Sequence, residues 1–292
     1  MRAQELFQNC IAFCENRGVS IPRFELYLLL EEFTGVSRAR LPLEREKEIS
    51  QTAEKRLMAA LESRCSGEPL QYLLGRWEFY GREFRVGPGV LIPRADTETL
   101  VEHALFYLQG LSAPKIADLC AGSGCVGVTL GLERSDAEVC LAELSEQAFF
   151  YLRENIRGLK AENCTAVRED VLSPARLPEG LDLIVSNPPY IPDGELGSLQ
   201  REVRREPAMA LSGGGDGLRF YRGIPSLWRA ALRPGGMLAF EIGCGQEQEV
   251  KELLLQSGYE EVRFRQDLSG IIRVVSGIKK KENGEERKNA EI

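Results

Sequence analysis

The amino-acid sequence predicts an α/β protein, in which a small all-α amino-terminal bundle precedes a doubly wound, seven-stranded sheet with an antiparallel terminal hairpin. From residue 115 onward, short apolar and β-branched runs alternate with amphipathic segments of helical period, as in βαβ units. The last two apolar runs are joined by only a few residues that include Gly270, which favours antiparallel pairing. Residues 1–75 instead show apolar positions at helical spacing.

Three helices are expected in the first 75 residues. An apolar stripe over residues 6–18 ends at a glycine, residues 20–35 begin with a Ser-x-Pro start signal, and residues 44–65 carry charges opposite their apolar positions. This bundle could simply cap the next domain. We favour a substrate-recognition domain at residues 1–75.

A β-hairpin connector is expected at residues 76–92, because aromatic and β-branched residues surround Gly81 and a Gly-Pro-Gly sequence ends the segment. A polar cluster follows, in which Asp96 or Thr97 could cap the next helix. Arg94 has no such structural explanation.

The alternating part of the chain, residues 93–277, is expected to be one domain. Its strands are predicted at residues 116–120, 137–144, 165–168, 181–186, 237–242, 261–264 and 271–275. Its helices are predicted at residues 123–132, 146–159, 218–232 and 246–256. Residues 278–292 mix charges of both signs with few apolar residues and are expected to form a disordered tail.

Composition excludes several classes of function. The formal net charge of -7 argues against broad binding of nucleic acid. The chain has a single histidine, His103, so Ser-His-Asp and Cys-His catalysis are excluded unless His103 is the catalytic histidine. No metal site is expected. No apolar run approaches the roughly 20 residues of a membrane span. We expect a cytoplasmic monomer.

A glycine-rich loop follows the first predicted strand, in the sequence Asp-Leu-Cys-Ala-Gly-Ser-Gly at residues 118–124. Glycines let the backbone approach a ligand closely, and the start of the next helix offers free N–H groups. Glu143, which ends the second strand, could accept hydrogen bonds from ribose hydroxyls. Asp170 and Val171 end the third strand, where they could hold an adenine ring, although Asp170 could instead cap a loop. Both a dinucleotide and an adenosyl cofactor fit these positions.

Asn187-Pro188-Pro189-Tyr190 ends the fourth strand. Two prolines lack N–H donors and fix φ, so the chain must leave the sheet there with a stiff backbone. Ligands bind at the carboxyl ends of strands in open α/β sheets. The motif could be a simple turn, but it would hold Asn187 and Tyr190 on a rigid turn beside the glycine-rich loop, where chemistry would occur.

These motifs resemble class I S-adenosylmethionine-dependent methyltransferases with a Rossmann-like sheet. The closer resemblance is to the release factor glutamine methyltransferases, the HemK/PrmC family, and it covers nearly the whole chain. The further stretches that carry it are residues 68–75, 92–98, 206–211, 241–246 and 267–273. The resemblance implies transfer of a methyl group from S-adenosyl-L-methionine to N5 of the glutamine in the Gly-Gly-Gln motif of peptide chain release factors.

The resemblance also implies roles for single residues. Catalytic roles fall to Asn187, Pro188, Pro189 and Tyr190, and the substrate-binding residues are the same four with Arg94. The implied cofactor-binding residues are Asp118, Cys120, Ala121, Gly122, Ser123, Gly124, Glu143, Asp170, Val171 and Asn187. Two positions depart from the family pattern, because Cys120 replaces a glycine and Glu143 replaces the more frequent Asp.

Three other functions are open on the sequence. The first is a nucleic-acid methyltransferase for exocyclic amines, adenine N6 or guanine N2, because those nitrogens are also planar and conjugated. The net charge of -7 and the helical bundle weigh against it. The second is an S-adenosylmethionine-binding adaptor without activity, and the third is a nicotinamide oxidoreductase.

Overall fold

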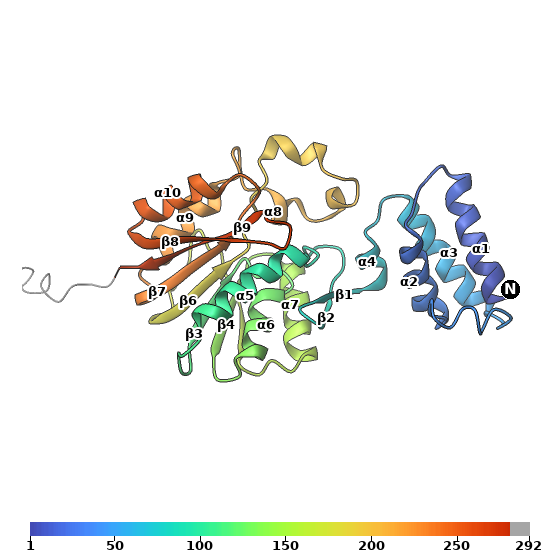
Figure 1. The fold of residues 1–292 in the computed structure, drawn as a ribbon, viewed down its shortest axis with the longest axis horizontal. Coiled ribbons are helices and arrows are strands. Elements are labelled where there is room, and N and C mark those ends of the chain that lie inside the picture. Colours follow the sequence, from blue (N-terminus) through green and yellow to red (C-terminus); the bar gives the residue numbers. More distant parts are fainter. Residues whose placement is uncertain (281–292) are drawn as a thin grey trace, which may run out of the picture. The chain divides into compact units, whose positions relative to one another are not determined.

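The computed structural model describes residues 1–280 of the chain (Figure 1). Within this range the chain forms two compact units. One consists of Met1–Arg76 together with Gln200–Arg205, and the other contains Trp77–Leu199 and the residues from Glu206 onward. Each unit is described by itself.

The helical unit contains α1 (Ala3–Asn16), α2 (Arg23–Thr34), α3 (Gln51–Cys65) and the short α4 (Leu70–Leu74). Leucines at positions 6, 29, 30, 57 and 61 are almost completely buried and form its core. The third helix begins at residue 51, later than the expected residue 44, because the Ser50 hydroxyl accepts a hydrogen bond from the Ala53 N–H and caps the helix there. The helix α4 was not expected from the sequence.

The segment Gln200–Arg205 belongs to the helical unit through contacts with Arg64. The Arg64 guanidinium pairs with Glu25 (Nε to Oε2, 2.6 Å) and with Glu202 (Nη1 to Oε1, 2.8 Å). Arg201 also donates a hydrogen bond to the Cys65 carbonyl at 3.2 Å. The 3-10 turn η3 (Val203–Arg205) ends the segment. Sequence reasoning did not anticipate this association.

The larger unit begins with β1 (Arg76–Phe79) and β2 (Arg82–Arg85), which pair with each other. Within the described residues, its main sheet has seven strands in the order β5-β4-β3-β6-β7-β9-β8. Their bounds are β3 (Lys115–Leu119), β4 (Glu138–Glu143), β5 (Cys164–Arg168), β6 (Leu181–Ser186), β7 (Leu232–Glu241), β8 (Tyr259–Gln266) and β9 (Ile272–Lys279). The first five strands of this order are parallel, and β9 runs antiparallel to β7 and β8. The predicted fold class is confirmed.

Helices cover both faces of this sheet (Figure 1). Along β6, Leu183 and Val185 belong to one buried cluster with α5 (Glu98–Tyr107), α6 (Cys125–Glu133) and α7 (Glu146–Gly158). Ile184 belongs to the other cluster, with α9 (Arg219–Trp228) and α10 (Glu247–Gln256), and a register irregularity between Leu181 and Leu183 explains why Leu181 belongs to that cluster too. Side chains of a strand alternate between the two faces, so an apolar run such as β6 fills both cores.

Two element boundaries differ from expectation. The helix predicted at residues 218–232 ends at Trp228, because Leu232 already pairs with Leu181 and starts β7. The strand β9 reaches Lys279, so its last two residues fall within the segment expected to be a disordered tail. The rest of that prediction, residues 281–292, lies outside the described residues. Among residues 1–280, no helix is long and apolar enough to cross a membrane.

Candidate active site

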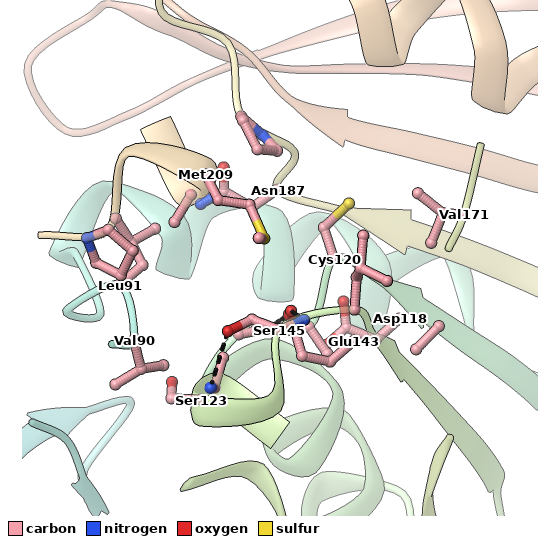
Figure 2. A pocket seen from close by; sticks show the side chains of 18 of the residues that line it. Val90, Leu91, Asp118, Cys120, Ser123, Glu143, Ser145, Val171, Asn187 and Met209 are labelled. Atoms are coloured by element: carbon pink, nitrogen blue, oxygen red, sulfur yellow. Dashed lines mark hydrogen bonds between the residues drawn. The ribbon is translucent and has the colours of Figure 1, made fainter. Parts of the chain in front are cut away.

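A cavity of about 450 Å³ opens at the carboxyl ends of β3, β4, β5 and β6 (Figure 2). The strand β3 lies between β4 and β6, so the chain winds outward in both directions from it. Loops that follow β3 and β6 therefore diverge and leave a crevice, as at the switch point of other doubly wound sheets. Figure 2 shows Asn187 and Met209 on one side of this cavity, and Glu143 and Ser145 on the other.

The glycine-rich loop contributes its backbone at Gly122. A Cβ atom there would meet no heavy atom within 4 Å, whereas a Cβ at Gly124 would lie 2.5 Å from Leu152 Cδ1. Gly124 is also absent from the residues that line the cavity. The two glycines therefore have different roles. Gly122 faces the open site, whereas Gly124 permits packing of α7 against the loop. Cysteine at position 120 adopts a φ of 61°, which costs a non-glycine residue roughly 1–2 kcal/mol.

Asp118 anchors the helix that follows this loop. Its side chain is 1% exposed, and Oδ2 accepts a hydrogen bond from the Gly127 N–H at 2.8 Å. A Cβ at Gly127 would lie 2.8 Å from the same oxygen, so this contact requires glycine. Burial raises the pKa of Asp118 to about 7, although the N–H of Gly127 works in the opposite direction.

The Glu143 carboxylate joins two loops at the floor of the cavity. Its Oε2 accepts from the Gly122 N–H at 2.8 Å and its Oε1 accepts from the Ser145 N–H at 2.7 Å. Burial raises the pKa of Glu143, and the backbone donors partly offset that rise. Each carboxylate oxygen can accept a second hydrogen bond, so this group can still bind vicinal hydroxyls.

Asp170 and Val171 line the same cavity. The Asp170 side chain also accepts a hydrogen bond from the Leu172 N–H at 2.9 Å, so it stabilises its loop while it faces the site. The other predicted cofactor residues Cys120, Ala121 and Ser123 are also lining residues.

The Asn187–Tyr190 turn is placed by the end of β6. The Ser186 hydroxyl donates to the Leu119 carbonyl at 2.6 Å, which joins the ends of β6 and β3. Asn187 and Pro189 line the cavity, whereas Pro188 and Tyr190 do not. The Tyr190 carbonyl accepts from Gln246 Nε2 at 3.1 Å, which fixes the end of the turn. Burial raises the pKa of the Tyr190 hydroxyl to about 12.

Arg94 lines the cavity and forms an ion pair with the Glu206 carboxylate. The other Glu206 oxygen accepts from the Ile92 N–H at 2.9 Å, and the residue is 5% exposed. Arg94 is therefore positioned by a buried carboxylate. Glu206 lies in one of the stretches that carry the resemblance, but sequence reasoning gave it no role.

Sequence reasoning missed further residues at this site, and it misread Thr97. The α5 start shows no side-chain cap from Thr97. Its hydroxyl instead accepts a hydrogen bond from Asn187 Nδ2 at 3.3 Å. Met209 and Phe220 line the cavity, and Glu241 lies behind Asn187. These residues come from separate elements, so no local spacing could have grouped them.

Comparison with known proteins shows which family the chain belongs to. Residues 5–75 match the family described as PrmC N-terminal domain, and residues 96–217 match the family described as Methyltransferase small domain. A release factor glutamine methyltransferase from Moorella thermoacetica is 40% identical over 267 residues, which cover 91% of this chain and 94% of that protein. One from Clostridium acetobutylicum is 36% identical over 255 residues, covering 86% of this chain and 90% of that protein. The chain belongs to the release factor glutamine methyltransferase family.

Solved structures extend the likeness of fold beyond this family. The catalytic domain of hMettl16, in complex with a 3′UTR hairpin, has a TM-score of 0.55 and 16% identity, covering 77% of this chain and 81% of that one. This likeness concerns the fold alone.

Proposed function

We propose that this chain transfers the methyl group of S-adenosyl-L-methionine to N5 of the glutamine in the Gly-Gly-Gln motif of peptide chain release factors, with S-adenosyl-L-homocysteine as product. The observation that carries this proposal is that Asn187 lines one cavity together with Gly122 and Glu143. Its family relatives, at 36–40% identity over most of the chain, bear the name release factor glutamine methyltransferase.

The residues around the cavity suit an adenosyl cofactor. Glu143 would accept hydrogen bonds from the ribose hydroxyls, and the exposed backbone at Gly122 would permit close approach. Asp170 and Val171 would hold the adenine ring. The glycine-rich loop would take its shape from the other predicted cofactor residues, Asp118, Cys120, Ala121, Ser123 and Gly124. S-adenosylmethionine, when bound, supplies a methyl group already activated by its sulfonium charge.

Asn187 and Pro188 would orient the glutamine side chain. An amide nitrogen is a poor nucleophile because its lone pair is delocalised, so the protein must orient and polarise it. The Asn187 Oδ1 atom and the Pro188 carbonyl can each accept one N–H of the substrate amide. Pro189 keeps this turn stiff. Tyr190, which does not line the cavity, would have to approach the bound substrate to pack on the amide plane, and the Gln246 contact fixes its carbonyl at the end of the turn.

Further parts of the proposal concern recognition. We propose that residues 1–75 recognise the release factor, that Arg94 contacts it beside the cavity, and that the enzyme works as a cytoplasmic monomer. The net charge of -7 favours a protein substrate over a nucleic acid, whose phosphates would be repelled.

The test offers labelled S-adenosylmethionine together with release factor, ribosomal RNA or DNA in parallel reactions. We expect label on the release factor alone, and none on a release factor variant that lacks the motif glutamine. Label on nucleic acid and none on the protein would overturn the proposal in favour of an exocyclic-amine methyltransferase.

A further inference from the structure

The Asn187 side chain contacts two buried residues on the side away from the cavity. Its Nδ2 atom lies 3.3 Å from Thr97 Oγ1. Glu241, the last residue of β7, lies close enough for the Thr97 and Asn187 side chains to favour its ionised form and so lower its pKa. Thr97 and Glu241 are 1% and 3% exposed. Three elements thus bring together a hydroxyl, an amide and a carboxyl group.

The donors and acceptors of this cluster permit one arrangement. A side-chain amide has two N–H donors and one oxygen acceptor, whereas a threonine hydroxyl has one hydrogen. Thr97 accepts one N–H of Asn187, so the Thr97 hydrogen and the second Asn187 N–H are the donors that this pair can offer to Glu241. Nδ2 therefore faces the buried side, and Oδ1 is left for the cavity that Asn187 lines. The opposite amide orientation would place Oδ1 against a carboxylate.

We propose that Glu241 and Thr97 are positioning residues, which hold the Asn187 amide so that Oδ1 faces the substrate nitrogen. The negative charge behind Nδ2 also polarises the amide and increases the negative charge on Oδ1. A more negative Oδ1 accepts a stronger hydrogen bond from the substrate N–H. This increases the electron density on the substrate nitrogen and favours its attack on the methyl group. This inference rests on the proposed function, because it refines the role of Asn187 in it.

The surroundings of Glu241 show that packing alone does not explain its presence. Among the described residues, Oε2 of Glu241 has no hydrogen-bond partner although it is buried. Leaving a polar atom unpaired in the interior is unfavourable, so an apolar residue would serve packing better. Burial raises the pKa of Glu241 to about 7.

The charged and titratable neighbours of Glu241 leave it without a dedicated cation. Arg273 lies nearby, but its guanidinium pairs with Asp96 at 2.7 Å and with Asp267 at 3.0 Å. The Asp96 carboxylate raises the pKa of Glu241. The other titratable groups that interact with Glu241 are Tyr190, Tyr221 and Cys125, and burial raises the pKa of all three. Ionisation of Glu241 is therefore favoured mainly by the Thr97 and Asn187 donors and by the shared Arg273.

The first test compares two substitutions of Thr97 in the full-length enzyme. Thr97→Val keeps the shape but removes the hydroxyl, whereas Thr97→Ser keeps the hydroxyl. We expect Thr97→Val to lower kcat about 10- to 100-fold with little change in KM for either substrate, and Thr97→Ser to recover most of that loss. Thr129→Val is the matched control, because the buried Thr129 hydroxyl has no partner among the described residues. It should leave kcat within about 2-fold of wild type.

The second test uses Glu241→Gln and the pH profile of kcat at saturating S-adenosylmethionine. In the wild type, protonation of Glu241 removes acceptor capacity, so kcat should fall as pH decreases through about 7. Glu241→Gln should have a low kcat that lacks this inflection. The pKa of Asp118 is also raised to about 7, and this residue lies at the glycine-rich loop. Saturating cofactor is used so that titration of Asp118 does not change the measured kcat through weaker cofactor binding. The thermal unfolding midpoint at pH 8 should not fall, because the variant removes a buried charge.

Three outcomes would overturn the inference. One is a Thr97→Val enzyme with wild-type kcat, another is equal loss in Thr97→Val and Thr97→Ser, and the third is retention of the inflection in Glu241→Gln. Failure of the proposed function gives a different result, since the wild-type enzyme would then place no methyl group on the release factor.

Discussion

At the scale of single residues, the site uses buried carboxylates to hold loops in place while they face a ligand. Glu143 is the clearest example, because each of its oxygens accepts a backbone N–H from a different loop. A glutamine at this position would present an NH₂ group to one of those two donors. The Glu143 carboxylate therefore shapes the cavity, apart from the role in cofactor binding that we propose for it.

Glu143→Gln should weaken S-adenosylmethionine binding about 10-fold, which corresponds to loss of about 1.4 kcal/mol from a charge-assisted hydrogen bond. Affinity in the wild type should also decrease as pH falls through the raised pKa of Glu143, because the protonated form accepts fewer hydrogen bonds. Isothermal titration calorimetry measures both effects. Glu146→Gln is the control, since that side chain is 83% exposed. Equal affinities for Glu143→Gln and wild type would remove Glu143 from the cofactor site.

Asn187→Ala should reduce kcat by roughly two to three orders of magnitude, taking about 3 kcal/mol for a lost polarising contact. The measurement is single-turnover methylation of release factor at saturating cofactor. Near wild-type turnover would show that Asn187 does not orient the nitrogen.

The residues that sequence reasoning found and missed differ in one respect. Gly122, Glu143 and Asn187 are local signals, since each ends a strand or belongs to a recognisable motif. Thr97 and Glu241 act only through Asn187, which lies 90 and 54 positions away from them. Their roles depend on the order of strands in the sheet, and a single sequence does not specify which donor meets which acceptor.

At the scale of elements, His103 illustrates how α5 is joined to the antiparallel end of the sheet. Its Nε2 lies 2.8 Å from Ser276 Oγ on β9, and its Nδ1 accepts from Arg265 Nε on β8 at 3.4 Å. Arginine can only donate, so Nδ1 must be the unprotonated nitrogen and Nε2–H donates to Ser276. His103 is buried and joins three elements, so these contacts give it a structural role.

His103 should remain neutral well below pH 6. Burial first, and then Arg265 and Arg263, lower its pKa from 6.5 to about 4. Stability from a neutral histidine is present above pH 6.5 and is lost as pH falls toward 4, at a cost of about 3 kcal/mol. Because the chain has one histidine, a single imidazole NMR signal reports the titration. A midpoint near 6.5 would contradict the buried, neutral assignment.

The sequence predicts the order of the helices and strands better than the residues at which they begin and end. The sequence pattern extended α9 to residue 232 because Leu232 continues the apolar spacing, but pairing with Leu181 assigns that residue to β7. Likewise, the apolar spacing alone did not reveal that Ser50 starts α3. Long-range pairing and capping both override local periodicity.

At the scale of the whole molecule, the helical unit includes a segment from a distant part of the chain. The Arg64 side chain is 11% exposed and pairs with Glu25 and Glu202, which are 39 and 138 residues away in sequence. Periodicity predicted a helical bundle, but it could not predict that residues 200–205 complete it.

Arg64→Ala should destabilise the helical unit by about 3–5 kcal/mol, because it leaves the buried Glu25 carboxylate without its partner. Hydrogen exchange of amides in α2 and α3 measures the effect within this unit. Arg17→Ala is the control, since the Arg17–Glu62 pair is largely exposed and should contribute less than about 1 kcal/mol. Equal protection in both variants would show that the Arg64 network does not stabilise the unit.

The central claim is that the nitrogen held by Asn187 belongs to a glutamine side chain. The most direct test is tandem mass spectrometry of release factor treated with this enzyme and S-adenosylmethionine bearing a labelled methyl group. The account predicts one labelled methyl on the side-chain amide of the Gly-Gly-Gln glutamine, and none when Asn187→Ala replaces the wild type. A methyl group at any other residue, or an unmodified release factor beside labelled nucleic acid, would contradict it.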